Sequence, residues 1–418
     1  MIRRALACVA VLAAVAVVAT VSAETTRAAF SDETTNVSTF SAASSFGGGP
    51  CSPYTHNWMT GMEHQYDTTA GGGIWSDGVS SGAAVVDTAV KRSGAASIKL
   101  SPNSSPVYRG RLYNGFGYPT IVMSFAMRFD TLPAADVYEL AGVTTVAATA
   151  NYVSLRYIAA TNQFSVGFPA EDVLSNINVE AGKWYTVDLK VDVGTTTHRI
   201  DWRLNGVAQT GTTRTDATTS LYGAGIGTGV SGIFTANYDD IVFSTTAADY
   251  PIGNVRILAL QPDGLGTSSG AGSFVDDDAT AIDATSALRL ADVPAGSGTT
   301  HIRQTAVGAT SYVEVTMDDT TESCVRGAHG MVVYDPLNTN QGNHGKTVAV
   351  DGTTESVVHD GAMRANNTFM NPKSAPLTAA GGAWTPAALN GLRFRIGYST
   401  DANPQPRWHS LVVEYDAG

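Results

Sequence analysis

Short runs in which apolar and polar residues alternate recur along most of the chain, and this pattern is typical of β-strands. The clearest run covers residues 184–192, WYTVDLKVD, where the apolar residues share one face; they are Tyr185, Val187, Leu189 and Val191. Because side chains alternate between the two faces of a strand, this face is expected to enter a core. The opposite face, with Asp188, is expected to meet solvent.

Turn-forming residues separate these runs, so many short strands are expected. Asn205-Gly206, for example, supplies the positive φ angles of a tight hairpin. In the first half the expected strands are 83–90, 96–100, 120–129, 152–158, 164–168, 184–193, 199–204 and 237–243. In the second half they are 255–260, 311–317, 331–334, 347–350, 392–398 and 410–415, with one helical turn at 386–389. The pattern predicts an all-β chain built from sandwiches or barrels.

The strand pattern is interrupted in three places, which divide the chain into four parts. An apolar leader opens the chain, a Ser/Gly-rich stretch with Gly47-Gly48-Gly49-Pro50 follows it, and Pro251 and Gly253 interrupt the strands near the middle. The predicted organisation is a signal peptide at 1–23, a flexible arm at 24–56, a first β domain at 57–247 and a C-terminal β-rich accessory domain at 248–418.

The leader indicates export. It has Arg3 and Arg4, an uncharged run from Ala5 to Thr20, and small residues ending at Ala23 that suit signal peptidase. A retained membrane anchor is the alternative, because the run approaches the length of a membrane span. Residues 27–42 also resemble the leader junction of some Gram-positive surface and matrix proteins. The chain is therefore expected to be secreted or bound at the surface of a bacterial, Gram-positive cell.

Charge and composition narrow the classes of partner. The chain has 25 Lys and Arg residues and 37 Asp and Glu residues, which gives a net charge of −12. A protein that neutralises nucleic-acid phosphates is expected to be basic, so nucleic acid is a poor candidate for the partner. Only 15% of residues are charged and 43% are hydrophobic, so the chain can bury a core. Outside the leader the cysteines are Cys51 and Cys324, which either pair in an oxidising compartment or remain thiols.

Several landmarks of the first half resemble a known family. They are Gly61-Met62-Glu63, the segment 92–100, the segment 182–185, the segment 202–206 and the segment 238–243. In this order and spacing the first domain resembles the concanavalin A-like, laminin-G-like jelly roll. The resemblance implies two antiparallel sheets packed face to face, in a family whose members bind glycans, bind proteins, hydrolyse glycans or serve as structure. The second half is similar to the accessory, β-sandwich-like domain that follows such jelly rolls in some bacterial exported and phage tail-type proteins.

The same resemblance implies a structural calcium ion. In jelly rolls of this kind, acids of the opening and closing strands share the ion, which here points to Glu63 and Asp240 with Asp239 as a further ligand. Carboxylate oxygens are the ligands that Ca²⁺ prefers. The alternative is that these acids end a strand or accept hydrogen bonds from loops. No histidine or cysteine spacing indicates zinc.

One segment combines aromatic rings with hydrogen-bond donors in a way that suits glycans. It runs from 108 to 118, and its candidate ligand-binding residues are Tyr108, Arg109, Arg111, Tyr113 and Tyr118. Sugar rings present apolar faces and hydroxyl groups, which aromatic platforms and guanidinium donors complement. Aromatic residues of β proteins are otherwise core residues, which remains the alternative.

The same choice between core and binding surface arises for three tryptophans. Trp202 shares a predicted face with Ile200 and Leu204 and is expected in the core. Trp384 and Trp408 lie beside prolines, where they either anchor loops or line a groove.

Catalytic motifs are weak. Both G-x-S-x-G matches, at 78–82 and 266–270, lie in Gly/Ser-rich loops without a following helix, and the Glu-x-Asp-x-Glu spacing of glycan hydrolases is absent. The sequence therefore favours an exported, non-catalytic glycan-binding or adhesion protein acting through the jelly roll. The alternatives are a structural or assembly component, of a phage tail-type or matrix kind, and a glycoside hydrolase or polysaccharide lyase.

Overall fold

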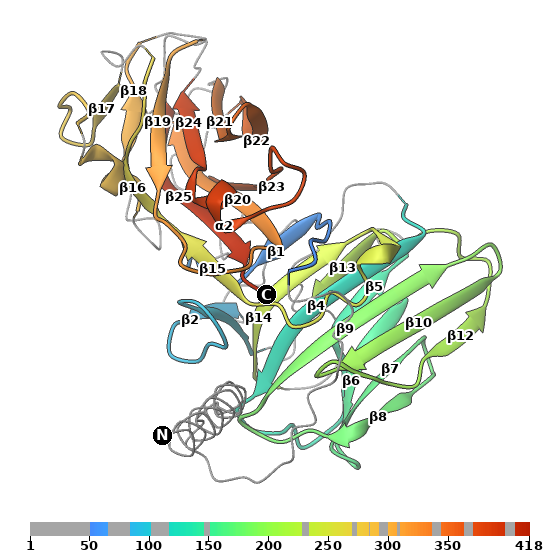
Figure 1. Cartoon of the computed structure of the whole chain (residues 1–418). Coiled ribbons are helices and arrows are strands. Elements are labelled where there is room, and N and C mark those ends of the chain that lie inside the picture. The colour runs from blue at the N-terminus through green and yellow to red at the C-terminus, as the bar shows by residue number, and fades with distance from the viewer. Residues whose placement is uncertain are drawn as a thin grey trace, which may run out of the picture. The chain divides into compact units, whose positions relative to one another are not determined.

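The computed structural model describes residues 51–65, 84–101, 117–145, 151–227, 234–269, 274–283, 285–291, 300–306, 310–336, 344–362, 371–397 and 406–418. Within these residues the strands form four antiparallel sheets, two from the first half of the chain and two from the second (Figure 1). The prediction of an all-β fold is confirmed. Among the helices that the structure describes, none has the length and apolar character needed to cross a membrane.

The first half contributes a nine-stranded and a five-stranded sheet. The larger has the order β11-β10-β9-β4-β14-β3-β2, with β1 on β14 and β12 on β10. Its strands are β1 Trp58–Thr60, β2 Ala84–Asp87, β3 Ser97–Leu100, β4 Thr120–Phe129, β9 Trp184–Val193, β10 Thr197–Leu204, β11 Val207–Ala208, β12 Thr212–Thr215 and β14 Ala236–Ser244. The smaller has the order β13-β5-β6-β7-β8 and consists of β5 Val137–Thr144, β6 Val153–Ile158, β7 Gln163–Gly167, β8 Val173–Asn178 and β13 Gly223–Ile226.

The second half also forms two sheets. One has the order β17-β18-β25-β20-β23 with β15 on β25, and contains β15 Ile257–Leu260, β17 Phe274–Asp276, β18 Ile302–Gln304, β20 Gly327–Pro336, β23 Asn371–Pro376 and β25 Pro406–Asp416. The other has the order β16-β19-β24-β21-β22, from β16 Pro262–Leu265, β19 Tyr312–Met317, β21 His344–Asp351, β22 Thr354–Ala362 and β24 Arg393–Gly397. The helical turns are η2 Ala247–Asp249, η4 Ser286–Leu290 and α2 Pro386–Asn390.

Each pair of sheets encloses its own hydrophobic core. In the first half, side chains from both sheets meet, among them Phe125 of β4 and Tyr157 of β6. Trp202 is 1% exposed, and its indole N–H donates to the Thr210 carbonyl at 2.8 Å, so its expected core position is confirmed. In the second half, Trp408 of β25 is fully buried in a separate core.

The apolar face of β9 is buried as predicted, but its polar face is not all in water. Asp188 is 1% exposed, because the chain between the two halves crosses this face and the Gly253 N–H donates to its Oδ1 at 3.0 Å. Burial raises the pKa of Asp188 to about 6. The expectation that Asp188 meets solvent is therefore wrong, since a connecting segment covers the strand.

The segment that precedes β1 is fastened at several points. A disulfide joins Cys51 to Cys324, with 5.4 Å between their Cα atoms. The Tyr54 hydroxyl donates to Asp416 Oδ2 at 3.0 Å, and the Thr55 N–H donates to Asp249 at 3.1 Å. These contacts hold residues 51–55 against Cys324, the end of β25 and η2.

Candidate functional site

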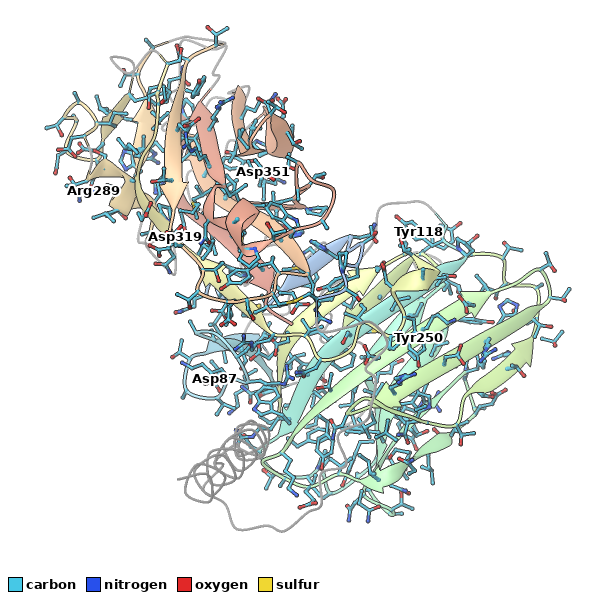
Figure 2. The ribbon with its side chains drawn as sticks, in the orientation of Figure 1. Asp87, Tyr118, Tyr250, Arg289, Asp319 and Asp351 are labelled. Atoms are coloured by element: carbon cyan, nitrogen blue, oxygen red, sulfur yellow. A yellow bond between two sulfur atoms is a disulfide. The ribbon has the colours of Figure 1, made fainter. Side chains whose placement is uncertain are left out.

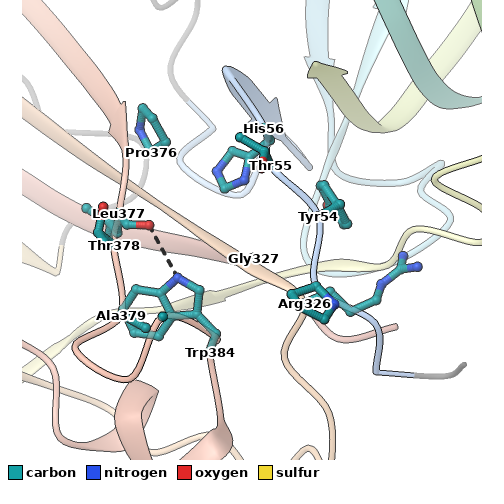
Figure 3. Close-up of a pocket in the computed structure, with 12 residues that line it drawn as sticks. Tyr54, Thr55, His56, Arg326, Gly327, Pro376, Leu377, Thr378, Ala379 and Trp384 are labelled. Carbon is teal, nitrogen blue, oxygen red and sulfur yellow. Dashed lines mark hydrogen bonds between the residues drawn. The ribbon is translucent and has the colours of Figure 1, made fainter. Parts of the chain in front are cut away.

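A pocket of about 260 Å³ opens where this segment meets the second half of the chain (Figure 3). One wall is the segment 53–56, a second is Arg326 with Gly327 at the start of β20, and a third is the loop 376–384. The volume lies just below the range of drug-sized ligand sites, which is about 300–1,000 Å³. The pocket is large enough for one small ring, such as a single sugar residue.

Trp384 contributes an indole ring to the lining of the pocket. It lies just before α2, whose first turn is capped by the Thr385 side chain and begins with Pro386. Its indole N–H donates to the Leu377 carbonyl at 3.3 Å, the contact drawn as a dashed line in Figure 3. The ring is 9% exposed and is held in one orientation, as a rigid stacking platform requires.

The cation of the pocket, Arg326, is held by the protein through both of its terminal nitrogens, while its Nε is buried without a hydrogen-bond partner. It forms an ion pair with the buried Asp416 at 2.6 Å, and it donates to the carbonyls of Ile252 and Asn254, both at 2.9 Å. Its guanidinium also lies over the ring of Tyr54, 5.4 Å from the centroid. The wall is therefore rigid, and its charge is balanced.

The imidazole ring of His56, which also lines the pocket, is neutral at physiological pH. His56 is 7% exposed, and burial lowers its pKa to about 4. Exposed side chains of Thr55 and Thr378 complete the rim. A site with flat rings, hydroxyl groups and no unbalanced charge suits a neutral, polyhydroxylated ligand better than an anion.

Most of the predicted glycan-binding segment lies outside the described residues, including Tyr108, Arg109, Arg111 and Tyr113. Tyr118 is described and labelled in Figure 2. It is half-buried against the first core, and its backbone pairs with that of Leu221. It does not line the pocket.

The predicted metal acids gather around one loop, residues 92–96. Asp239 Oδ2 accepts from the Arg92 N–H at 2.7 Å, and Asp240 pairs with the Arg92 guanidinium. Glu63 Oε2 accepts from the Ala95 N–H at 2.7 Å, while its Oε1 is buried without a hydrogen-bond partner. The structure thus brings all three acids to one place, where loop donors satisfy most of their oxygens.

Burial perturbs these acids strongly. It raises the pKa of Glu63 to about 8, with the charge of Glu414 adding to the effect. It also raises the pKa of Asp239, and that of Asp240 although Arg92 opposes the shift. Gly94 adopts φ +55°, and a Cβ there would lie 2.0 Å from Glu63 Oε1, so only glycine fits the loop.

Sequence reasoning did not single out Tyr54, His56 or Arg326. They belong to segments far apart in the chain, and no local motif joins them. The available signal was the pair Cys51 and Cys324, because a disulfide between them brings the residues that follow each cysteine together.

Comparisons with known proteins give structural neighbours only. No family model matches the sequence, and no curated protein matches it. One solved structure is Cellulose induced protein, Cip1, with 14% identity and a TM-score of 0.35 over 45% of this chain and 97% of that one. The GH131 β-glucanase catalytic domain from Podospora anserina has 9% identity and a TM-score of 0.30 over 46% of this chain and 97% of that one. A Trypanosoma rangeli sialidase has 13% identity and a TM-score of 0.26 over 40% of this chain and 31% of that one.

These neighbours correct the functional prediction. Two of the three are named as a glucanase catalytic domain and a sialidase, so the expected non-catalytic glycan-binding or adhesion protein is wrong by this comparison and is dropped. With TM-scores of 0.35 or lower, these likenesses carry no argument about the activity of this chain. The proposal below therefore rests on the geometry of this chain.

Proposed function

We propose that this chain is a carbohydrate-active protein that processes an extracellular glycan and holds one neutral sugar residue in the Trp384 pocket. The single observation that carries the proposal is the pocket itself, a volume of about 260 Å³ with a fixed indole on one side. The apolar face of a pyranose stacks on such a ring, while its hydroxyl groups meet the polar rim.

The rigidity of the walls supports recognition of this kind. Arg326 is anchored by Asp416 and two carbonyl groups, and Tyr54 donates to the same carboxylate. A preorganised pocket loses little side-chain entropy on binding. None of the lining residues carries a carboxylate, so the pocket is assigned to holding the sugar.

Incubating the purified chain with a panel of neutral and acidic polysaccharides tests the proposal. Released reducing ends and unsaturated uronate products report cleavage, and calorimetry reports binding. Thr55 is exposed at the rim, so Thr55→Trp fills the pocket without disturbing the core. We expect saturable action on at least one glycan and at least a tenfold loss of kcat/KM in Thr55→Trp.

The matched control is Thr213→Trp, at an exposed position of β12 in the first half of the chain. It should behave as the wild type. Neither binding nor products from any glycan, or equal action by Thr55→Trp and the wild type, would refute the assignment.

We propose in addition that the first half of the chain is a concanavalin A-like jelly roll and that the chain is exported. The two antiparallel sheets of the first half and their shared core support the former, and the leader at 1–23 supports the latter.

We also carry the calcium site forward as a proposal. The orphaned Oε1 of Glu63 supports it, because a buried oxygen without a partner is costly and an ion would satisfy it. Such an ion would bind Glu63 Oε1 beside the loop 92–96, whose Arg92 already holds Asp239 and Asp240, and its role would be structural.

A further inference from the structure

Beyond the glycan pocket, we propose that His56 and His329 bind a transition-metal ion of the Zn²⁺ class. The two side chains are 7% and 2% exposed, and their rings face each other with 5.5 Å between centroids and 50° between planes. His56 comes from the segment before β1, and His329 from β20.

The ring nitrogens of this pair lack partners. Both nitrogens of His329 are buried without a hydrogen bond, and so is Nε2 of His56. A neutral imidazole carries one N–H and one lone pair, and burying either of them without a partner carries a free-energy penalty. A metal ion bonded to a lone pair removes part of that penalty.

The geometry fits a shared ion. Zinc binds imidazole nitrogen at about 2.0–2.1 Å, so two rings at a tetrahedral angle have centroids roughly 5 Å apart. The observed 5.5 Å is close to that spacing. A hydrogen bond with the Ala328 backbone engages the other nitrogen of His56, which fixes the tautomer and leaves the Nε2 lone pair for a ligand, as in many metal sites.

The surroundings supply buried carboxyl groups and a route of access. Glu414 of β25 pairs in register with His329 of β20, which places the two side chains on the same face of the sheet. Its carboxyl is buried, and so is that of Glu63. His56 also lines the pocket, which gives an ion a route to the pair.

Two other groups in the described residues serve as internal comparisons. His301 and His409 also lie 5.5 Å apart, but both have other interactions, and Nδ1 of His409 contacts the Thr300 carbonyl at 2.9 Å. Within the described residues, one group of three or more acids, histidines or cysteines has ligand atoms that all lie within 4.8 Å of one another. It consists of Asp276, Asp277 and Asp278. The histidine pair therefore contributes two protein ligands, with water to complete the shell.

Calorimetry with Zn²⁺ and visible spectroscopy with Co²⁺ test the site on the full chain stripped of metal. We expect one equivalent of tightly bound Zn²⁺ and the absorption bands of tetrahedral Co²⁺. His56→Gln and His329→Gln should each weaken binding at least tenfold, while His301→Gln leaves it unchanged. Circular dichroism checks that each variant is folded.

A wild type that binds neither metal overturns the proposal, as does binding that survives His56→Gln. Binding that is lost in Asp277→Asn instead moves the site to the acidic group and also overturns it. None of these readouts uses a glycan, so the result is independent of the pocket's ligand.

Discussion

At the scale of single residues, the polar side chains that matter most are buried ones. Asp188, Glu63 and Glu414 are each between 1% and 4% exposed, although acidic side chains usually face water. Their sequence neighbourhoods do not reveal this, because the segments that cover them come from distant parts of the chain. The sequence shows that these residues are acids, but it does not show that other segments bury them.

The raised pKa of Glu63 makes stability depend on pH. Its folded pKa of about 8 lies above its ordinary value of 4.5, so the folded state holds a proton that the unfolded state releases. The contribution is complete below about pH 4.5 and is lost as pH rises through about 8. Without calcium, the Tm of the wild type should fall by several degrees over this range, and that of Glu63→Gln should fall less.

Measuring the Tm with added calcium tests the proposed metal site. If Ca²⁺ binds Glu63, adding it at about pH 8 should raise the Tm of the wild type by several degrees and leave Glu63→Gln unchanged. Equal responses of both proteins to calcium would count against the site. Glu180→Gln, at an exposed position, is the control.

At the scale of elements, segments in which apolar and polar residues alternate strongly were correctly predicted as strands, whereas strands with weak alternation were missed. The predicted strands 120–129 and 184–193 coincide with β4 and β9, and the helical turn at 386–389 is part of α2. The strands β13 and β23 were not predicted. Their sequences, GAGI and NPKSAP, lack alternation, and pairing with β5 and β20 defines them.

The segment before β1 should depend on its disulfide. Cys51 and Cys324 are 273 residues apart, and on a chain-entropy view closing so long a loop stabilises the fold by about 5 kcal/mol. Cys51→Ser with Cys324→Ser should therefore lower the Tm by several degrees and weaken glycan binding, because the segment 53–56 forms one wall of the pocket.

Thermal denaturation and calorimetry of this double variant check the prediction. Thr213→Ser, at an exposed position of β12, is the control for a conservative replacement. An unchanged Tm together with unchanged glycan binding would show that the other contacts of Tyr54 and Thr55 hold the segment without the disulfide.

At the scale of the whole molecule, composition and strand pattern were sufficient for the fold class. Few charged residues, many short alternating runs and frequent turns predicted sheets packed on sheets, and the structure has four of them in its described residues. The candidate site was not predictable in the same way. The pocket gathers residues near 54, 326 and 384, and only the folded chain brings these segments together.

The central claim is that a sugar residue occupies the pocket beside Trp384. A crystal structure of the full chain with an oligosaccharide chosen from the glycan panel tests it most directly. We predict a pyranose ring stacked on the Trp384 indole, between the segment 53–56 and the loop 376–384. Sugar density confined to the sheets of the first half, with this pocket empty, would contradict the claim.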